Sequence, residues 1–291
     1  MKLRDPKRSS ARVRPSGRPA PKVRPARSGP VHVELISIGR ELLRGKIADG
    51  NAQQVARRLT QHGAMIRRIT VVDDRPGSIS AAVREALERD PHLVVTTGGL
   101  GPADDDRTAE GVADAVRRPL GLDHETKSLV EEAYRRLSSK NIVAGGLTAA
   151  REGLCWIPVG ATPVVNPLGV APGLLVRMPG GAVVLSLPGT PEEMLAVLET
   201  ALPLLKLAFE GGIAEREIEA PTSDESALAP LLDRLAGEFP GVWINSRPAG
   251  SRRSGRRVVV RVEATAASQA EAAAVVDGCV ERLLALAAGN P

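Results

Sequence analysis

The segment whose residue types could do chemistry is VVTTGGLGPADDDRTAEGV, at positions 94–112. Its three glycines, at 98, 99 and 101, let backbone N–H groups approach an anion closely. The start of the helix predicted after them adds about half a positive charge. The glycine turn therefore indicates phosphate binding, but the three aspartates at 104–106 would repel a bare phosphate.

Two explanations for these aspartates remain open. Carboxylates at this point can cap the helix by accepting hydrogen bonds from its first N–H groups, or they can hold a divalent cation that bridges to phosphate. Capping explains one or two aspartates well and three less well. The loop is neither a Walker A loop nor a G-x-G-x-x-G motif, because no Lys-Ser/Thr pair and no third spaced glycine follows.

The elements around this loop alternate between strand and helix. Runs rich in β-formers at 33–38, 65–72 and 92–97 are separated by helical patterns at 51–63 and after Pro76. This order predicts right-handed crossovers and a parallel sheet covered on both faces, so the fold class is α/β. Ligands in such sheets bind at the carboxyl ends of the strands, where the glycine loop should lie.

The remaining chain predicts more helices and a second, smaller unit. Helical patterns occur at about 109–118 and 124–140, and two strands flank a turn at 180–181. After a boundary near 211–212, the order strand, helix, strand, strand, helix fits a small α+β domain. The expected parts are a disordered Arg/Pro-rich tail at 1–30, a main domain at 31–210 and a small βαββα domain at 211–291.

The net charge of +5 is not spread evenly along the 291 residues. Residues 1–30 hold ten of the 39 Lys and Arg but one of the 34 acids, which makes this tail +9 and leaves −4 for the rest. A solvated tail is the plain interpretation; contact with nucleic acid, a transit peptide and a wrongly assigned start are the alternatives. The five arginines at 246–257 favour a solvated loop over a nucleic-acid or acidic partner.

Composition excludes several classes of protein. Only five aromatic residues occur, too few for stacking on single-stranded nucleic acid. Two cysteines, Cys155 and Cys279, and four histidines without motif spacing do not form a metal motif or a disulfide framework, which fits a cytoplasmic protein. No apolar run approaches the ~20 residues that a membrane span needs.

Four segments follow one another along the chain: IGRELLRGKIADGNA (38–52), TTGGLGPADDDRTAE (96–110), NPLGVAPG (166–173) and LPGTPEEM (187–194). In order and spacing they together resemble the molybdopterin-binding domain of the CinA (competence-damage-inducible protein) family, and more distantly MogA and MoaB. The resemblance covers about 33–209, and WINSRPAG resembles the small module of short CinA-like proteins. It implies a three-layer α/β domain, often oligomeric, that binds a pterin or adenine nucleotide phosphate. We do not expect the amidohydrolase domain that deamidates nicotinamide mononucleotide in many members.

The resemblance also implies roles for individual residues. Some members cleave ADP-ribose with a divalent metal, so Asp105 and Asp106 are expected to bind Mg²⁺, Mn²⁺ or Co²⁺ or to activate water, and Glu41 is the next catalytic carboxylate. For Asn51, ligand contact and helix capping compete about equally. The expected ligand- or phosphate-binding residues are Gly98, Gly99, Gly101, Asn51, Asn166, Gly169, Gly173 and Gly189, with Glu193 beside them.

Two departures from the family pattern bear on catalysis. Arg40 replaces a threonine, which changes the local donors and still favours an anionic ligand. Gly153 stands where the family has a lysine, and Arg151 is the nearby residue that would have to replace it. Three functions therefore remain: a metal-dependent hydrolase of a nucleotide diphosphate such as ADP-ribose, a non-catalytic binder or carrier of molybdopterin, and a nucleic-acid-associated factor acting through its tail.

Overall fold

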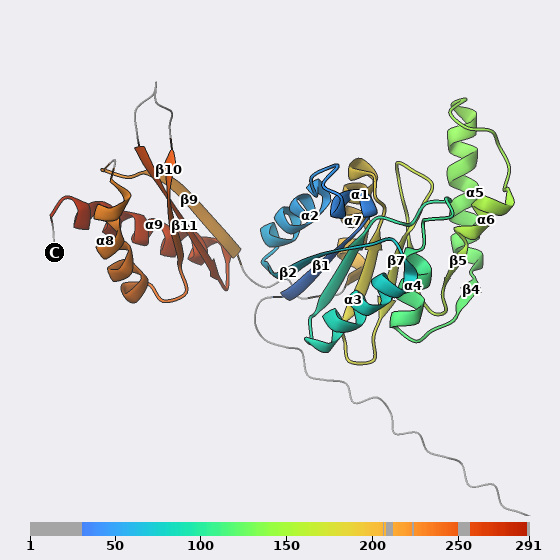
Figure 1. Cartoon of the computed structure of the whole chain (residues 1–291), viewed down its shortest axis with the longest axis horizontal. Coiled ribbons are helices and arrows are strands. Elements are labelled where there is room, and N and C mark those ends of the chain that lie inside the picture. The colour runs from blue at the N-terminus through green and yellow to red at the C-terminus, as the bar shows by residue number, and fades with distance from the viewer. Residues whose placement is uncertain (1–30, 206, 208–211, 223, 250–256, 290–291) are drawn as a thin grey trace, which may run out of the picture.

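The computed structural model describes the chain except residues 1–30, 206, 208–211, 223, 250–256 and 290–291 (Figure 1). The tail expected to be disordered and the middle of the arginine loop therefore lie outside the described residues. No helix in the part of the chain that is described is long and apolar enough to cross a membrane.

A six-stranded sheet forms the centre of the larger unit, in the order β2-β1-β3-β8-β7-β6. The first four strands of this order are parallel; β7 is antiparallel to β8, and β6 is antiparallel to β7. The mostly parallel α/β class expected from the sequence is confirmed. The strands are β1 (Val31–Ile38), β2 (Ala64–Val72), β3 (Leu93–Thr97), β6 (Thr162–Val164), β7 (Gly173–Arg177) and β8 (Val183–Leu187).

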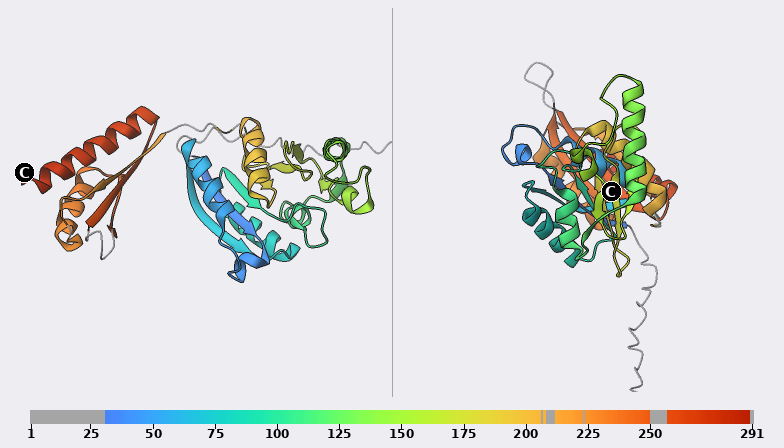
Figure 2. Two further views of the ribbon diagram at one scale, coloured as in Figure 1. Left: turned by 90° about the horizontal axis from the view of Figure 1, so that it is seen from above. Right: turned by 90° about the vertical axis from the view of Figure 1, so that its right-hand side faces the viewer.

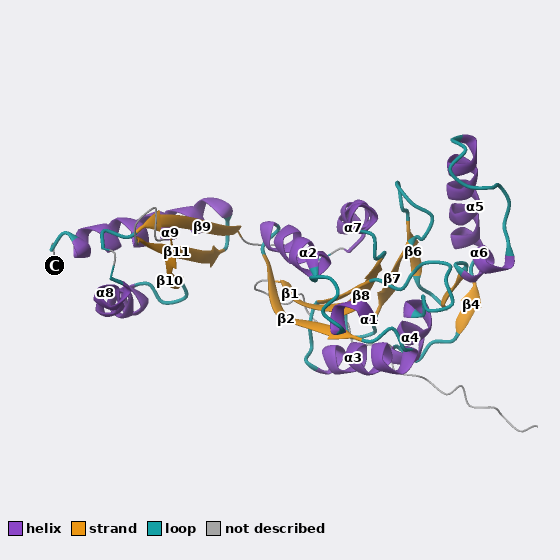
Figure 3. Cartoon of the chain, turned by 45° about the horizontal axis from the view of Figure 1, so that its top comes forward, coloured by secondary structure: helices purple, strands orange, loops and turns teal. Residues whose placement is uncertain are grey.

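Helices cover both faces of this sheet, which gives three layers (Figure 3). On one face α2 (Gly50–Gln61) and α7 (Pro191–Leu205) pack on alternate strand residues such as Leu35 and Val95. On the other face α3 (Pro76–Glu88) and α4 (Thr108–Ala115) pack on the intervening residues, such as Ile36. Because successive strand side chains point to opposite faces, the fully buried β3 serves both cores.

Smaller elements complete this unit. The expected turn at 180–181 joins β7 and β8, with Gly181 at φ 90. The structure also contains elements that the sequence did not indicate, since such short segments carry too little periodicity to detect. These are β6 and also α1 (Arg40–Leu43), β4 (Leu120–Leu122), α6 (Ala149–Gly153) and β5 (Trp156–Pro158), beside the expected α5 (His124–Ser139).

The second unit has the expected order of strand, helix, strand, strand, helix. Its antiparallel sheet runs β10-β11-β9, and one face is covered by both helices, with α9 lying along the sheet (Figure 2). Every second residue of β11, such as Val260 and Val262, is buried against them. The elements are β9 (Gly212–Glu219), α8 (Glu225–Glu238), β10 (Trp243–Ala249), β11 (Arg257–Ala266) and α9 (Gln269–Ala287).

Candidate functional site

A cavity of about 400 Å³ lies where the parallel strands β2, β1, β3 and β8 end. This is the edge at which open α/β sheets bind ligands. Its wall comes from the connections that leave these strands. The lining residues are Ile38, Gly39, Glu41, Leu42, Ile47, Ala48, Asp49, Gly50, Asn51, Asp74, Thr97, Gly98, Gly99, Asp105, Asp106, Gly189 and Pro191.

The glycine turn after β3 is held at its first residue, Gly98. The N–H of Gly98 donates to the carbonyl of Leu187 at 3.0 Å, and the hydroxyl of Thr108 donates to the carbonyl of Gly98 at 2.7 Å. Gly98 and Gly99 have φ values of 98 and 65, in the left-handed region. A Cβ added to Gly98 would also lie 2.5 Å from the carbonyl oxygen of Ile38. The backbone therefore requires glycine here, as the sequence predicted.

The three aspartates do not cap the following helix. Helix α4 has Arg107 at its N-cap and no side-chain cap hydrogen bond. Instead, Asp106 Oδ2 accepts the N–H of Ala103 at 3.0 Å and closes a turn within the loop. Asp105 and Asp106 line the cavity, whereas Asp104 does not. The capping explanation is thus wrong for this helix, and two of the three carboxylates are available at the cavity.

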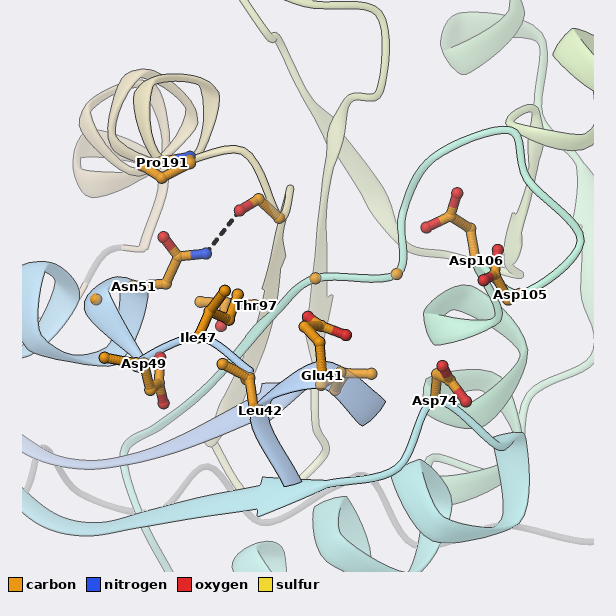
Figure 4. A pocket seen from close by; sticks show the side chains of 17 residues that line it. Glu41, Leu42, Ile47, Asp49, Asn51, Asp74, Thr97, Asp105, Asp106 and Pro191 are labelled. Carbon is orange, nitrogen blue, oxygen red and sulfur yellow. Dashed lines mark hydrogen bonds between the residues drawn. The ribbon is translucent and has the colours of Figure 1, made fainter. Parts of the chain in front are cut away.

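The cavity wall is strongly acidic and unevenly arranged. Five carboxylates line it and none of its lining residues is Lys or Arg. Figure 4 shows Asp74, Asp105 and Asp106 on one side of the cavity and Ile47 and Asn51 on the other. Asp49 lies beside Ile47 and Asn51, so a ligand would meet three carboxylates at one end and an apolar side chain, an amide and one carboxylate at the other.

Asp74 was missed by the sequence analysis. It follows β2 as Asp105 and Asp106 follow β3, and a polar residue just after a parallel strand is the signal that could have identified it. Burial raises the pKa of Asp74, and the hydrogen bond between Asp74 and Asp73 lowers the pKa of Asp73. These two neighbouring carboxyls interact directly.

Arg40 supplies the counter-charge for Asp73 and Asp74. Its Nη2 lies 3.1 Å from Asp73 Oδ1 and 2.8 Å from Asp74 Oδ1, and it does not line the cavity. Hydrogen bonding to Asp73, followed by the charges of both aspartates, raises the pKa of Arg40. The guanidinium that was expected to favour an anionic ligand instead binds the protein's own carboxylates.

Asn51 joins the two sides of the apolar end. Its Nδ2 donates to the carbonyl of Gly189 at 2.7 Å, which ties the start of α2 to the turn before α7. The helix cap is supplied by Asp49, whose Oδ1 accepts the N–H of Ala52 at 3.0 Å. Of the two roles considered for Asn51, capping is therefore taken by Asp49, and its side chain faces the cavity.

The NPLGVAPG segment lies outside this cavity. Asn166 is 6% exposed and its amide donates to the carbonyl of Ala171 at 2.8 Å and to Glu193 Oε2 at 2.7 Å. Its Oδ1 accepts the N–H of Gly169 at 2.8 Å. A Cβ on Gly173 would lie 2.5 Å from Val197 Cγ1. In this structure these residues hold the loop and its packing on α7, and they are not brought to the cavity with Gly189.

A second cavity of about 510 Å³ shares Asp106 with the first and is lined by Gly101 and Gly153. The position of the missing family lysine therefore lies beside the aspartate loop. Arg151 does not fill that place, because its guanidinium lies 3.9 Å from the ring centroid of Tyr134 and donates to the carbonyl of Ala144 at 2.8 Å.

The donor set fits a cation that arrives with a phosphate. Carboxylate oxygens suit Mg²⁺ and Mn²⁺, and Mg²⁺ is usually held by one or two carboxylates together with substrate phosphates. Among the described residues no group of three or more His, Cys, Asp or Glu side chains is arranged to hold a metal ion. Asp105 and Asp106 could therefore supply part of a coordination shell, and the ligand the remainder.

The arginines considered for nucleic-acid binding are paired where they are described. Arg247 binds Glu217 at 3.0 Å, a carboxylate that it shares with Arg261 of β11 at 3.1 Å, and Arg257 binds Glu219 at 3.3 Å. Residues 250–256 of this loop lie outside the described part. The sheet surface formed by β9, β10 and β11 is thus an alternation of both charges, which gives no net basic face.

Known proteins match the region that contains the cavity. A family model described as a probable molybdopterin binding domain matches residues 34–207. A Pyrococcus horikoshii protein is 40% identical over 222 residues, covering 76% of this chain and 85% of that protein. An Aeropyrum pernix protein is 40% identical over 251 residues, covering 86% and 91%. The crystal structure of the protein CinA with unknown function from Thermoplasma acidophilum aligns over 60% of this chain and 98% of that chain, at 37% identity and a TM-score of 0.54.

Proposed function

Since the chain belongs to the family of probable molybdopterin-binding domains, we propose that its cavity binds a pterin or adenine nucleotide phosphate with a divalent cation and hydrolyses a diphosphate linkage. The observation that carries this proposal is the cavity wall, which places five carboxylates beside a glycine turn with no lining Lys or Arg. An anionic ligand would be repelled from such a wall unless a cation accompanied it.

The ligand's two ends would meet different surroundings. Its phosphates would lie beside Asp105 and Asp106, and its ring would lie against the apolar side chains of Leu42 and Ile47. Ile47 is 57% exposed, so a ring placed on it would remove apolar surface from water. The N–H of Gly98 is already bonded to Leu187, which leaves the N–H of Gly99 to donate to a phosphate oxygen.

For ADP-ribose, a water oxygen would bond to the adenylyl phosphorus while the bridging P–O bond breaks. The products are AMP and ribose 5-phosphate. A bound divalent cation supplies charge neutralisation and a more acidic water. Asp105 and Asp106 would hold that cation, and Glu41, which lines the same cavity, would accept the proton that the water loses.

One observation favours a second function, binding or carrying molybdopterin without cleavage. Gly153 offers no cation to the leaving phosphate, and Arg151 is held on Tyr134. Without that charge the leaving group is poorly stabilised, although binding through the glycine turn and the cation would remain.

Incubation with ADP-ribose and Mg²⁺, Mn²⁺ or Co²⁺, with measurement of AMP release, tests the proposal. The double substitution Asp105→Ala, Asp106→Ala should abolish release, and Asp104→Ala should retain it because Asp104 does not line the first cavity. No release with any metal, together with saturable binding of the nucleotide, would contradict hydrolysis and support the carrier function.

A further inference from the structure

A separate cavity of about 390 Å³ lies at the opposite end of the main sheet from the candidate site. It is lined by residues near the start of β1, by the middle of β2 and by the connection from α3 to β3. The site cavity lies where β1 ends, so the two cavities lie toward opposite ends of this strand. The lining residues are His32, Val33, Glu34, Arg67, Arg68, Arg89 and Pro91.

A break in the strand register places two arginines in this cavity. Val33 pairs with Ile66, but the next residue, Glu34, pairs with Arg68, so Arg67 is an extra residue in β2. In a regular strand, consecutive side chains point to opposite faces. Here Arg67 and Arg68 both line one cavity, because the bulge changes the direction of a side chain.

The positive charge of the third arginine, Arg89, is already neutralised by a carboxylate. Glu34 is buried, with its side chain 5% exposed, and its two carboxylate oxygens accept from Arg89 Nε at 2.7 Å and Nη2 at 2.5 Å. Hydrogen bonding to Glu34 raises the pKa of Arg89. A bidentate pair of this kind satisfies the hydrogen bonds of the buried carboxylate, so the charges of Glu34 and Arg89 neutralise each other.

His32 orients one of the two remaining arginines. Arg67 Nη2 lies 3.0 Å from His32 Nε2. A guanidinium has only donors, so the ring nitrogen must accept, and the imidazole in this arrangement is neutral. It therefore fixes Arg67 without cancelling its charge. The guanidinium of Arg68 has no hydrogen bond or ion pair with any other residue that the structure describes.

We propose that this cavity binds a phosphate dianion, either inorganic phosphate or the phosphate of a small ester. Its lining carries three guanidinium groups and one carboxylate, and that carboxylate, Glu34, is already paired with Arg89. Two neighbouring guanidinium groups repel each other unless an anion lies between them, and their planar donors match phosphate oxygens. The cavity has room for more than the phosphate alone, so an ester group can enter with it.

Binding of inorganic phosphate to the full chain, measured by titration calorimetry in EDTA, tests this site. EDTA removes the divalent cations on which phosphate binding in the acidic cavity would depend, so the result does not depend on the proposed function. Arg67→Gln and Arg68→Gln should each weaken binding by about tenfold or more, since each removes charge-assisted hydrogen bonds. Arg68→Lys should retain charge, lose the bidentate geometry and give an intermediate affinity.

Arg57→Gln is the matched control, because Arg57 is an exposed arginine of α2 outside this cavity. It should leave phosphate affinity unchanged. The same protein with Asp105→Asn and Asp106→Asn should also bind phosphate normally. No saturable binding by the unsubstituted protein, or equal losses in Arg57→Gln and Arg68→Gln, would overturn the proposal. Thermal unfolding of each variant would show that the fold is retained.

A second probe separates the two sources of phosphate. Glycerol 3-phosphate, titrated in the same way, should bind more tightly than inorganic phosphate if the site is built for an ester. Tighter binding of inorganic phosphate would assign the site to the free ion. Either result assigns the bound phosphate to this cavity only if Arg67→Gln and Arg68→Gln also weaken the binding.

Discussion

Asn51 donates a hydrogen bond from Nδ2 to the carbonyl oxygen of Gly189 at 2.7 Å, across 138 positions of sequence. This contact joins the start of α2 to the connection after β8, and both residues line the cavity. The apolar end of the candidate site is therefore held by a side chain as well as by the sheet.

Asn51→Asp should damage this end of the site. A carboxylate cannot donate to the Gly189 carbonyl, and it adds negative charge to a wall that already has five carboxylates. We expect a loss of about 1 kcal/mol in the free energy of unfolding and weaker binding of nucleotide. Gln53→Ala, at an exposed position of the same helix, should change stability by less than about 0.5 kcal/mol. Denaturant unfolding and nucleotide titration check both; equal effects of the two substitutions would refute the role of Asn51.

Gly98→Ala should destabilise the protein because of its backbone conformation. The φ of 98 is unfavourable for alanine, and the new Cβ would lie 2.5 Å from the Ile38 carbonyl oxygen. The expected cost is about 1–3 kcal/mol of unfolding free energy. Gly77→Ala, where no atom lies within 4 Å of the added Cβ, should be neutral or stabilising by up to about 1 kcal/mol. The prediction fails if urea denaturation gives both variants the same stability.

Arg40→Thr, which restores the residue type expected from the family, should strengthen cation binding beside Asp74. Without Arg40 the carboxyls of Asp73 and Asp74 lose their counter-charge, so the cavity wall becomes more negative. We expect an affinity for Mn²⁺ about tenfold higher, measured by the electron paramagnetic resonance signal of free Mn²⁺, and an affinity near that of the unsubstituted protein in Arg40→Lys, which keeps the positive charge.

Arg58→Thr is the control for Arg40→Thr. It breaks the ion pair between Arg58 and Glu199, which joins α2 to α7, and neither residue lines the cavity. Mn²⁺ affinity should be unchanged. An unsubstituted protein that binds no Mn²⁺ would contradict the proposed function, whereas equal affinity in all variants would contradict only the role of Arg40.

The small domain should lose stability in acid through Glu238. Hydrogen bonds from Arg282 of α9 and Arg234 of α8 lower the pKa of Glu238 to about 2. Because this value lies below the ordinary 4.5, the stabilisation is fully present above pH 4.5 and is lost as the pH falls through about 2. The pair is exposed, so salt should reduce the effect.

Glu238→Gln should therefore lower stability at neutral pH and flatten its decline between neutral pH and about pH 3. Glu281→Gln, at an exposed position of α9, is the control and should keep the decline of the unsubstituted protein. The free energy of unfolding of both variants and of the unsubstituted protein, measured at several pH values, tests this prediction. An unchanged slope in Glu238→Gln would show that other carboxylates govern the acid response.

The sequence predicted the fold because its signals are local. The apolar run that became β3, the glycine turn after it and the Pro at the start of α3 each specify their own conformation. The aspartates also fell at the expected edge. Periodicity and turn chemistry are enough for these features.

Other features depend on neighbours in space, which one sequence does not reveal. Asp74 enters the cavity because β2 lies beside β1, a matter of strand order. Asn166 is engaged by Glu193, which lies on α7 and accepts from its amide, and so it holds a loop where ligand contact had been expected. Arg40 has the charge for a ligand but has two aspartates within reach.

Gly153→Lys tests whether the missing cation limits catalysis. Gly153 lines the cavity that shares Asp106 with the candidate site, and no atom lies within 4 Å of an added Cβ. It belongs to the short helix α6, which accepts lysine without strain. A lysine there would place its ammonium near the aspartate loop and the leaving phosphate. If the protein is a hydrolase, AMP release from ADP-ribose should rise by about tenfold with little change in nucleotide affinity.

Ala150→Lys is the control, because it adds the same positive charge one turn earlier on the same cavity wall. Equal gains from both lysines would indicate simple attraction of the substrate, and no release from either, with nucleotide still bound, would mean that the glycine turn serves binding alone.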